Sequence, residues 1–417
     1  MTIAIRKKKV AYFIYNSYII LLPILNIYRI GLPIGDIVGL VLFPYFALRC
    51  NKMKGEKQDK RNAHRYRIFL VYVIILLPIQ MCICRSFDLS DVLSRLVHII
   101  LYSMYGIFFS FYLFDYDFFC VMILKIACIL APLTIIQQII YRAVGIKTYL
   151  LLHYLDLNYS IIDYSEYVRR FNVATESSGY RASSIFLEPA HFCMYILIPL
   201  AIVFMKKNKR HIDHIVIMVI CVSIICSYST GGVFGLLICV FYYIILLREN
   251  QKKWFKVVLI LFSSFAGIYI LTCNTQLVSL IVGRISEIGS NVYDTSGNRR
   301  VLRGFILWRK LPNLIKIFGA GVGMLQGTII KLNLIVLTDV SYSEEMNTYA
   351  TLLCTNGIIG TVLYCRSIIT EYKKKNELCQ LITILFLLTS IFNNYIYQAI
   401  SVLYLVFVFT TVRRKKR

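Results

Sequence analysis

Charged residues are scarce in this chain, and so are polar stretches long enough to form a soluble domain. Asp, Glu, Lys and Arg make up 16% of the 417 residues, whereas 58% are hydrophobic and the mean hydropathy is +0.68. An ordinary soluble domain has about 25% charged residues. The composition therefore excludes such a domain and predicts an all-α polytopic integral membrane protein, with room for about a dozen spans of about 20 residues each.

The chain also lacks the features that divide or process a protein. No internal repeat, low-complexity stretch or Pro/Ser linker interrupts it, which favours one membrane domain over residues 1–417. No small-x-small cleavage site follows the first apolar run, so we expect that run to remain as the first span. The 13 cysteines lie mostly inside apolar stretches, which indicates buried hydrophobic residues rather than a disulfide framework. We predict no metal site and no cofactor.

Apolar runs predict about twelve transmembrane helices. They cover residues 10–30, 31–48, 68–84, 96–114, 118–140, 190–205, 214–229, 231–247, 256–272, 347–365, 378–393 and 395–412. The basic residues cluster between them, at 6–9, 49–67, 206–210, 248–256, 373–375 and 413–417. If the N-terminus is cytoplasmic, counting spans places all these clusters in the cytoplasm, as the positive-inside rule requires. The net charge of +25 therefore needs no nucleic-acid partner, and both termini are predicted to be cytoplasmic.

The same count leaves two long segments outside, at about 141–189 and 273–346. Both contain arginines, although basic residues are usually rare on that side. A guanidinium group presents a planar fork that matches phosphate oxygens, which suits a lipid pyrophosphate at the bilayer surface. The alternative is that these arginines contact lipid headgroups or pair with nearby acidic residues.

The first external segment ends in a polar stretch directly before a span. It contains Arg181, Ser184, Glu188, Pro189 and His191. The proline suits the first turn of a helix, because that position leaves an N–H group without a partner in any case. Glu188 either stabilises the helix N-terminus or positions and deprotonates a sugar hydroxyl. A single histidine such as His191 is more often a packed polar residue than a base.

The second external segment has a Ser-Gly-Asn turn at 296–298. In the helix expected after it, Arg299 and Arg303 share one face, with Arg300 beside them. Such an amphipathic helix either adheres to the membrane surface or contributes to a site. The glycine run 319–323 lacks the G-x-G-x-x-G spacing of a nucleotide-binding loop, so we reject that interpretation.

Two further polar positions stand at the ends of spans. Asn347 begins the span 347–365 and either binds a sugar or caps the helix. Ser229 and Thr230 lie in a short turn between two short spans. A turn at this depth requires protein or a wet cavity to satisfy its backbone.

Together these residues resemble the O-antigen and capsule polymerase family, commonly called Wzy, within the O-antigen ligase and polymerase group. The resemblance rests on residues 181–189, the turn at 229–231, the stretch 296–303 with the glycine run 319–323, and residues 347–360. It covers the chain from about 180 to 360, and the plan of about twelve spans extends over the rest.

The resemblance implies a metal-independent glycosyltransferase in the bacterial plasma membrane that uses undecaprenyl-pyrophosphate-linked oligosaccharides rather than nucleotide sugars. Membrane lipids, a chain-length regulator and a flippase are the implied partners. A terminal sugar hydroxyl of one repeat would attack the anomeric carbon of the growing chain, and lipid pyrophosphate would leave. The candidate catalytic residues are Arg181, Glu188, Arg299, Arg300 and Arg303, and the candidate substrate-binding residues are Ser184, His191, Ser229, Thr230 and Asn347.

Other functions remain open at this point. The ligase branch typically has a histidine immediately before the asparagine, where this chain has Met346, which counts against a ligase and also removes an obvious general base. A flippase or transporter for lipid-linked sugars would predict charges along the spans and, often, an internal repeat. A non-catalytic scaffold would tolerate loss of Arg181 or Arg299.

Overall fold

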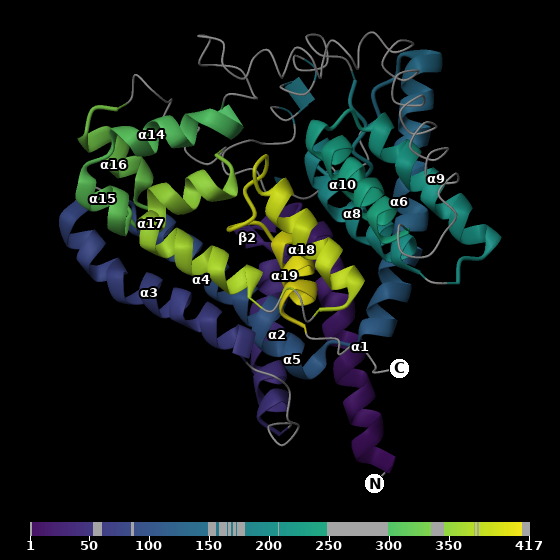
Figure 1. Ribbon diagram of the computed structural model, residues 1–417, viewed down its shortest axis with the longest axis horizontal. Coiled ribbons are helices and arrows are strands. Elements are labelled where there is room, and N and C mark those ends of the chain that lie inside the picture. The colour runs from purple at the N-terminus through teal and green to yellow at the C-terminus, as the bar shows by residue number, and fades with distance from the viewer. Residues whose placement is uncertain are drawn as a thin grey trace. The chain divides into compact units, whose positions relative to one another are not determined.

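The computed structural model describes residues 2–52, 61–84, 87–148, 156–157, 165, 168–169, 172, 180–206, 208–247, 299–334, 346–370, 372 and 375–410. Helices make up most of these residues (Figure 1). Five helical stretches are long and apolar enough to cross a membrane: Ile34–Asn51, Ala63–Ile83, Leu89–Leu113, Tyr116–Val144 and Thr348–Ile369. The protein is thus a helical membrane protein, whereas the number of twelve spans stays a prediction.

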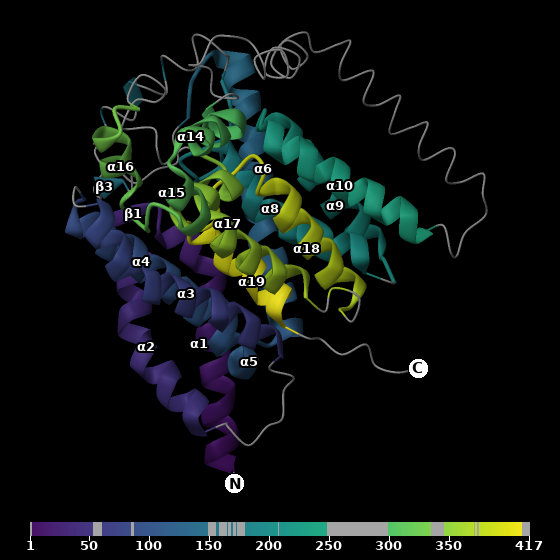
Figure 2. The ribbon, with the colours of Figure 1, turned by 60° about the vertical axis from the view of Figure 1, so that its left-hand side comes forward.

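The chain forms two compact units, and unit 1 comprises Met1–Pro23, Asp36–Phe119 and Glu287–Arg417. Its central helix is α17, which packs against α3 and α15; both views show these helices side by side (Figures 1 and 2). Helix α19 packs against α18 and η1. The described helices of this unit are α1 (Thr2–Leu25), α2 (Ile34–Lys52), α3 (Arg61–Cys84), α4 (Leu89–Ser103), η1 (Met104–Phe109), α5 (Ser110–Leu113), η2 (Arg299–Arg303), α14 (Gly304–Lys310), α15 (Asn313–Phe318), α16 (Leu325–Lys331), α17 (Thr348–Ile369), α18 (Glu377–Thr389) and α19 (Ile400–Phe409).

Unit 2 comprises Ile24–Gly35 and Cys120–Ser286. Helix α8 packs against both α9 and α10, and α9 contacts α10. The described helices of this unit are α6 (Tyr116–Val144), which begins in unit 1, α8 (Pro189–Met205), α9 (His211–Cys226) and α10 (Thr230–Leu247). The prediction of a single membrane domain concerns the whole chain and stays a prediction.

Unit 2 also contains a small antiparallel sheet that the sequence analysis did not predict. Its strands are β1 (Tyr28–Ile30), β2 (Leu32–Pro33) and β3 (Asp156–Leu157), in the order β2-β1-β3. Gly31, with a φ of 71°, makes the turn between the first two strands. The predicted first span, 10–30, therefore ends at Leu25. Local apolarity could not reveal these strands, because β3 lies far along the chain from its partner.

Several apolar helices are too short to cross a bilayer alone. Helix α18 has 13 residues and α19 has 10, so at 1.5 Å per residue α19 is about 15 Å long, against a hydrocarbon core of about 30 Å. Between them, residues 390–399 are largely non-helical, yet Ser390 and Asn393 are buried. Irregular backbone at membrane depth requires partners within the protein. Those partners belong to the site described next.

A helix covers most of every predicted span except 256–272, which lies outside the described residues. Four of the predicted spans extend into longer stretches of non-helical chain, because residues 26–33 form a turn and two strands and residues 390–399 are largely non-helical. Much of the two predicted external loops, including residues 296–298, also lies outside the described residues. The loop arrangement and the orientation of the termini therefore stay predictions.

Candidate functional site

Helix α17 is broken at Gly357, whose φ of 69° and ψ of −175° lie outside the helical region. At the break, the carbonyls of Cys354 and Thr355 accept hydrogen bonds from the N–H groups of Ala320, at 2.8 Å, and Gly321, at 2.9 Å. Buried backbone groups must find partners. The loop that contains Ala320 and Gly321 therefore provides hydrogen bonds to the backbone of the broken helix.

The close contact between this loop and α17 depends on glycine. All three glycines of the run 319–323 have positive φ. A Cβ atom on Gly319 would lie 2.2 Å from the carbonyl oxygen of Thr355, and one on Gly357 would lie 2.2 Å from that of Ile317. No other residue type fits at either position without moving backbone. The glycine run thus has a packing role against α17.

Helices α3 and α4 also contact the junction between this loop, α15 and α17. The Tyr72 hydroxyl donates to the carbonyl of Asn356, at 2.9 Å, and the Gln80 amide donates to that of Phe318, at 2.8 Å. A Cβ atom on Gly323 would lie 2.6 Å from a backbone atom in the first turn of α4. The start of α4 is therefore packed directly against the end of the glycine run.

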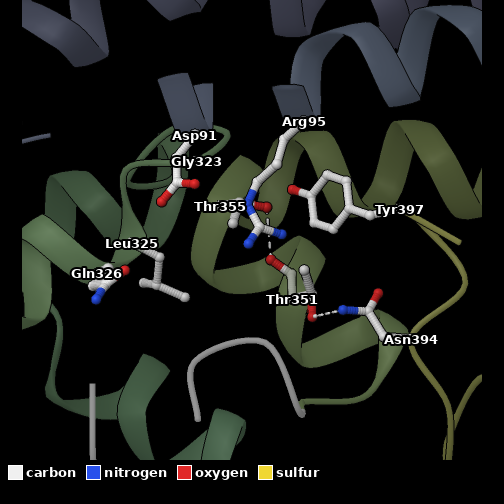
Figure 3. Close-up of a pocket in the computed structure, with 9 residues that line it drawn as sticks. All are labelled: Asp91, Arg95, Gly323, Leu325, Gln326, Thr351, Thr355, Asn394 and Tyr397. Carbon is white, nitrogen blue, oxygen red and sulfur yellow. Dashed lines mark hydrogen bonds between the residues drawn. The ribbon is translucent and has the colours of Figure 1, made fainter. Parts of the chain in front are cut away.

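A pocket, which we call the polar pocket, opens beside this junction in unit 1 (Figure 3). Its cavity volume is about 30 Å³, and it is partly open to solvent. Four separate parts of the chain contribute to it: α4, the glycine run with α16, α17, and the segment 390–399. Its lining residues are Asp91, Arg95, Gly323, Leu325, Gln326, Thr351, Thr355, Asn394 and Tyr397.

Arg95 is the cation of the polar pocket. The Cζ atom of its guanidinium group lies 4.9 Å from the centroid of the Tyr397 ring, within cation–π range. Asp91 stands one turn earlier on the same helix, and Figure 3 shows both side chains reaching from α4 toward α17. Asp88 caps this helix, because its carboxylate accepts a hydrogen bond of 2.8 Å from the Ser90 N–H.

Hydroxyl and amide groups form the opposite wall of the polar pocket. The Asn394 amide donates to the Thr351 hydroxyl, at 3.2 Å, and the Thr355 hydroxyl lies 2.7 Å from the carbonyl oxygen of Thr351 (Figure 3). Thr351 and Thr355 are each 3% exposed. The wall is therefore polar, although it lies within a span.

The first residue of α17 holds the segment 390–399 in place. The N–H and hydroxyl groups of Thr348 lie 3.0 and 2.7 Å from the carbonyl oxygen of Asn393. The Thr348 hydroxyl also accepts a hydrogen bond of 2.8 Å from the Tyr395 N–H. These bonds satisfy the irregular backbone between α18 and α19, and they position Asn394 and Tyr397 at the pocket.

Asn347 has a structural function in unit 1. It is completely buried, and its side-chain oxygen Oδ1 accepts a hydrogen bond from the Ala350 N–H, at 2.8 Å, which caps α17. Its amide donates to the carbonyl of Val301 in η2, at 3.2 Å. The helix-capping alternative is thus the one that the geometry supports, and direct contact with a sugar stays a prediction.

The three candidate arginines of the second external segment occupy η2, a π-helical turn that continues into α14. Arg303 is partly buried. The side chains of Arg299 and Arg300 lie outside the described residues, so only the path of their backbone is known. Their contact with a pyrophosphate stays a prediction.

Met346, the residue where the ligase branch has histidine, is 3% exposed and belongs to an apolar cluster with Leu307, Ile329 and Ala350. A Cβ atom on Gly304 would lie 2.7 Å from its sulfur. The position before Asn347 is therefore a packing position in this chain.

In unit 2, Glu188 is the N-cap residue of α8 and makes no side-chain capping hydrogen bond, and Pro189 occupies the first turn as predicted. The backbone of Ser184 is held by the Gln137 side chain of α6: the Ser184 N–H donates to it at 2.8 Å, and its amide donates to the Ser184 carbonyl at 2.9 Å. Ser184 is buried and has a φ of 55°. This pair fixes the path of the chain just before α8.

The remaining predicted residues of unit 2 lie at or near helix starts. Arg181 and His191 are partly buried, on either side of the Glu188 cap. Ser229 caps α10, because its hydroxyl accepts a hydrogen bond of 3.3 Å from the Gly232 N–H, and Thr230 is the first residue of that helix. The predicted site residues thus fall into two groups, one in each compact unit.

The sequence analysis missed the polar pocket. Asp91 and Arg95 were absent from the predicted site, as were Asn394 and Tyr397. A signal did exist, because span counting places residues 85–95 and the turn between the last two spans on the same side of the membrane as the loop 273–346. Polar residues at span ends on that shared side were candidates for one site.

A buried polar cluster lies farther along α4. Asp36, 3% exposed, accepts a hydrogen bond of 3.0 Å from the Tyr102 hydroxyl, and its other oxygen lies 2.8 Å from His98 Nε2. A charge at membrane depth requires such partners. Among the described residues, no group of three or more His, Cys, Asp and Glu side chains is placed to hold a metal ion.

Neither the models of known protein families nor the curated protein sequences match this chain.

Proposed function

We propose that the protein is a polysaccharide polymerase that joins undecaprenyl-pyrophosphate-linked oligosaccharide repeats on the extracytoplasmic face of the bacterial plasma membrane. It would act without metal or cofactor in making O-antigen, capsule or exopolysaccharide. Its termini would lie in the cytoplasm. A chain-length regulator and a flippase are its expected partners. The regulator would set the length of the polymer, and the flippase would carry the substrate across the membrane first.

One observation supports this proposal most directly. Span counting assigns residues 85–95, the loop 273–346, the start of α17 and the turn between α18 and α19 to the side opposite the basic runs. In unit 1, residues from all four line the polar pocket. A polar pocket on that side is what an enzyme acting on lipid-linked sugars outside the cell requires. Its placement agrees with the proposed topology.

In the proposed reaction, a sugar hydroxyl oxygen of the incoming repeat attacks the anomeric carbon of the lipid-linked chain. The bond from that carbon to the pyrophosphate oxygen breaks, and undecaprenyl pyrophosphate leaves with the electron pair. Negative charge therefore grows on the leaving group, and arginines fixed beside it would stabilise the transition state more than the ground state. We assign this role to Arg299, Arg300 and Arg303, and we assign Arg181 to the donor or acceptor.

A base must take the proton that the attacking hydroxyl loses. Glu188 is the candidate base, and it stands at the start of α8 in unit 2. The residue before Asn347 is the buried Met346, which cannot serve as a base. This difference favours a polymerase over a ligase. Ser184, His191, Ser229, Thr230 and Asn347 are proposed to shape the substrate site.

The test is reconstitution of the purified protein in liposomes with a lipid-linked oligosaccharide repeat, without nucleotide sugar or metal. The intact protein should give a ladder of polymers on a gel. Arg181→Ala and Arg299→Ala should each lower the rate by about 10²- to 10³-fold, the usual cost of losing one charge-stabilising donor. Arg65→Ala is the matched control, because Arg65 lies in the predicted cytoplasmic run 49–67 and contacts Thr370.

Other results would identify the alternatives. Movement of the labelled lipid-linked sugar across the bilayer, without a ladder, would replace the polymerase with a flippase. A ladder that survives in both arginine variants would contradict the arginine roles. Neither polymer nor transport, in a protein that still supports polymer formation in cells, would indicate a scaffold.

A further inference from the structure

We infer that the polar pocket binds the hydroxyl edge of an uncharged sugar ring of the acceptor repeat, and not the pyrophosphate. This inference rests on the proposed function, and it assigns the acceptor repeat to the polar pocket. The pyrophosphate of the donor would then contact arginines outside this pocket.

The charge of the lining is the first argument. The pocket has one carboxylate, Asp91, and one guanidinium, Arg95, and its seven other lining residues are uncharged. The formal charges cancel. A pyrophosphate would require an excess of positive charge, and a carboxylate in the same small pocket would repel it. A neutral ligand meets no such penalty.

The hydrogen-bonding capacity of the lining is the second argument. Sugar hydroxyls both donate and accept hydrogen bonds. Asp91 supplies acceptors and Arg95 supplies donors, while the side chains of Gln326, Asn394 and Tyr397 extend the polar lining. A lining with both capacities suits a polyhydroxylated ring, and it discriminates strongly against analogues that lack a hydroxyl.

The openness of the pocket is the third argument. Its cavity volume is only about 30 Å³, and the rest of the space beside its lining is open to solvent. A sugar ring would therefore place one edge, with its hydroxyls, against the lining, and the rest of the repeat would extend outside, toward the exposed Gln326.

The surrounding structure holds the recognising groups in place. The Tyr397 ring lies under the Arg95 guanidinium, and the Asn394 amide is bonded to Thr351. Thr348 in turn fixes the segment that carries Asn394 and Tyr397. Arg95 and Asp91 are therefore proposed ligands of the sugar, whereas Tyr397 is a positioning residue for Arg95.

The test compares two probes on the purified protein in detergent, by isothermal titration calorimetry. The first is the lipid-free oligosaccharide, released by mild acid from the lipid-linked repeat used in the polymerisation assay. The second is inorganic pyrophosphate. We expect Arg95→Gln and Asp91→Asn each to weaken oligosaccharide binding by about tenfold or more, because each removes a charged hydrogen-bonding partner. Arg95→Gln should leave pyrophosphate binding unchanged.

Asp88→Asn is the matched control. Like Asp91→Asn, it removes one negative charge from α4, but at a residue outside the polar pocket. Asparagine caps helices as well as aspartate does, so the helix start should be unaffected. Its oligosaccharide affinity should equal that of the intact protein. Thermal unfolding of all variants within a few degrees of the intact protein would show that each is folded, and Tyr397→Phe provides a milder second variant that keeps the ring under Arg95.

Two results would overturn the inference: oligosaccharide binding that none of the pocket variants weakens, or pyrophosphate binding that Arg95→Gln abolishes. The failure of the proposed function is a different result. A polymer ladder from intact protein that does not bind the oligosaccharide would overturn the sugar pocket and leave the polymerase. Oligosaccharide binding that depends on Asp91 and Arg95, without any ladder, would support the sugar pocket and overturn the polymerase.

Discussion

Helices α6 and α17 both carry a residue that disfavours helix, but they accommodate it differently. Helix α6 has 29 residues with Pro132 inside, and apolar side chains such as Ile129 and Ile136 are exposed along it. Helix α17 has 22 residues, breaks at Gly357 and buries polar side chains. Helix α6 also buries polar side chains such as Gln137, and α17 also exposes apolar ones such as Val362, so burial does not separate the two helices. The comparison indicates that a helix can break where another segment binds the carbonyls it releases, as the loop with Ala320 and Gly321 does for α17.

The largest expected effect comes from filling the break in α17. Gly357→Ala would place a Cβ atom 2.2 Å from the Ile317 carbonyl oxygen in a residue with a φ of 69°. Strain and overpacking together should lower the free energy of unfolding by about 3 kcal/mol or more. Thermal unfolding of the purified protein would measure this loss, or the variant would fail to accumulate.

Gly31→Ala is the control for that substitution. Gly31 has a φ of 71° and nothing within 4 Å of an added Cβ atom, so it isolates the backbone cost of about 1–2 kcal/mol. Equal losses at the two positions would show that close packing at the break contributes nothing.

The next largest loss of stability is expected from releasing the segment 390–399, which Thr348 at the start of α17 holds in place. Thr348→Val keeps the shape of the side chain but removes the hydroxyl that accepts from the Tyr395 N–H. A buried donor left without its partner costs about 1–3 kcal/mol, so we expect a loss of about 2 kcal/mol. Thr361→Val, which removes only a bond to a carbonyl of its own helix, should cost less. Equal losses in denaturant unfolding would contradict the special role of Thr348.

A smaller effect is expected at the start of α17. Asn347→Ala removes the cap and the bond to Val301, and it should cost about 1–2 kcal/mol. Asn347→Ser keeps a capping oxygen without burying a charge and loses the amide that reaches Val301, so it should restore about half of that stability. If the serine variant is no more stable than the alanine variant, capping is not the role of Asn347.

The smallest effect is expected in α6. Pro132→Ala should change stability by less than about 1 kcal/mol, because prolines in transmembrane helices are tolerated when neighbouring groups adjust. The same thermal unfolding assay measures it. A loss as large as that of Gly357→Ala would mean that the two helices do not differ in the way proposed.

Parts of the candidate site were visible in the sequence. The glycine run 319–323 and the stretch 347–360 both contributed to the resemblance, but nothing local showed that they pack against each other. The start of α8 was predicted correctly at Pro189 because helix starts follow local rules. Arg95 was missed because its partner Tyr397 lies about 300 residues away in the chain.

The sequence by itself determined that the chain is a helical membrane protein and where most of its helices run. Each of those properties depends on the apolarity of neighbouring residues, since a chain in lipid must satisfy its own backbone hydrogen bonds locally. Only the tertiary structure decided that α17 breaks against the glycine run, that Asn347 links α17 to η2, and that Asp91, Arg95, Asn394 and Tyr397 share one pocket. Those contacts join distant segments, and they arise from packing that no short stretch of sequence specifies.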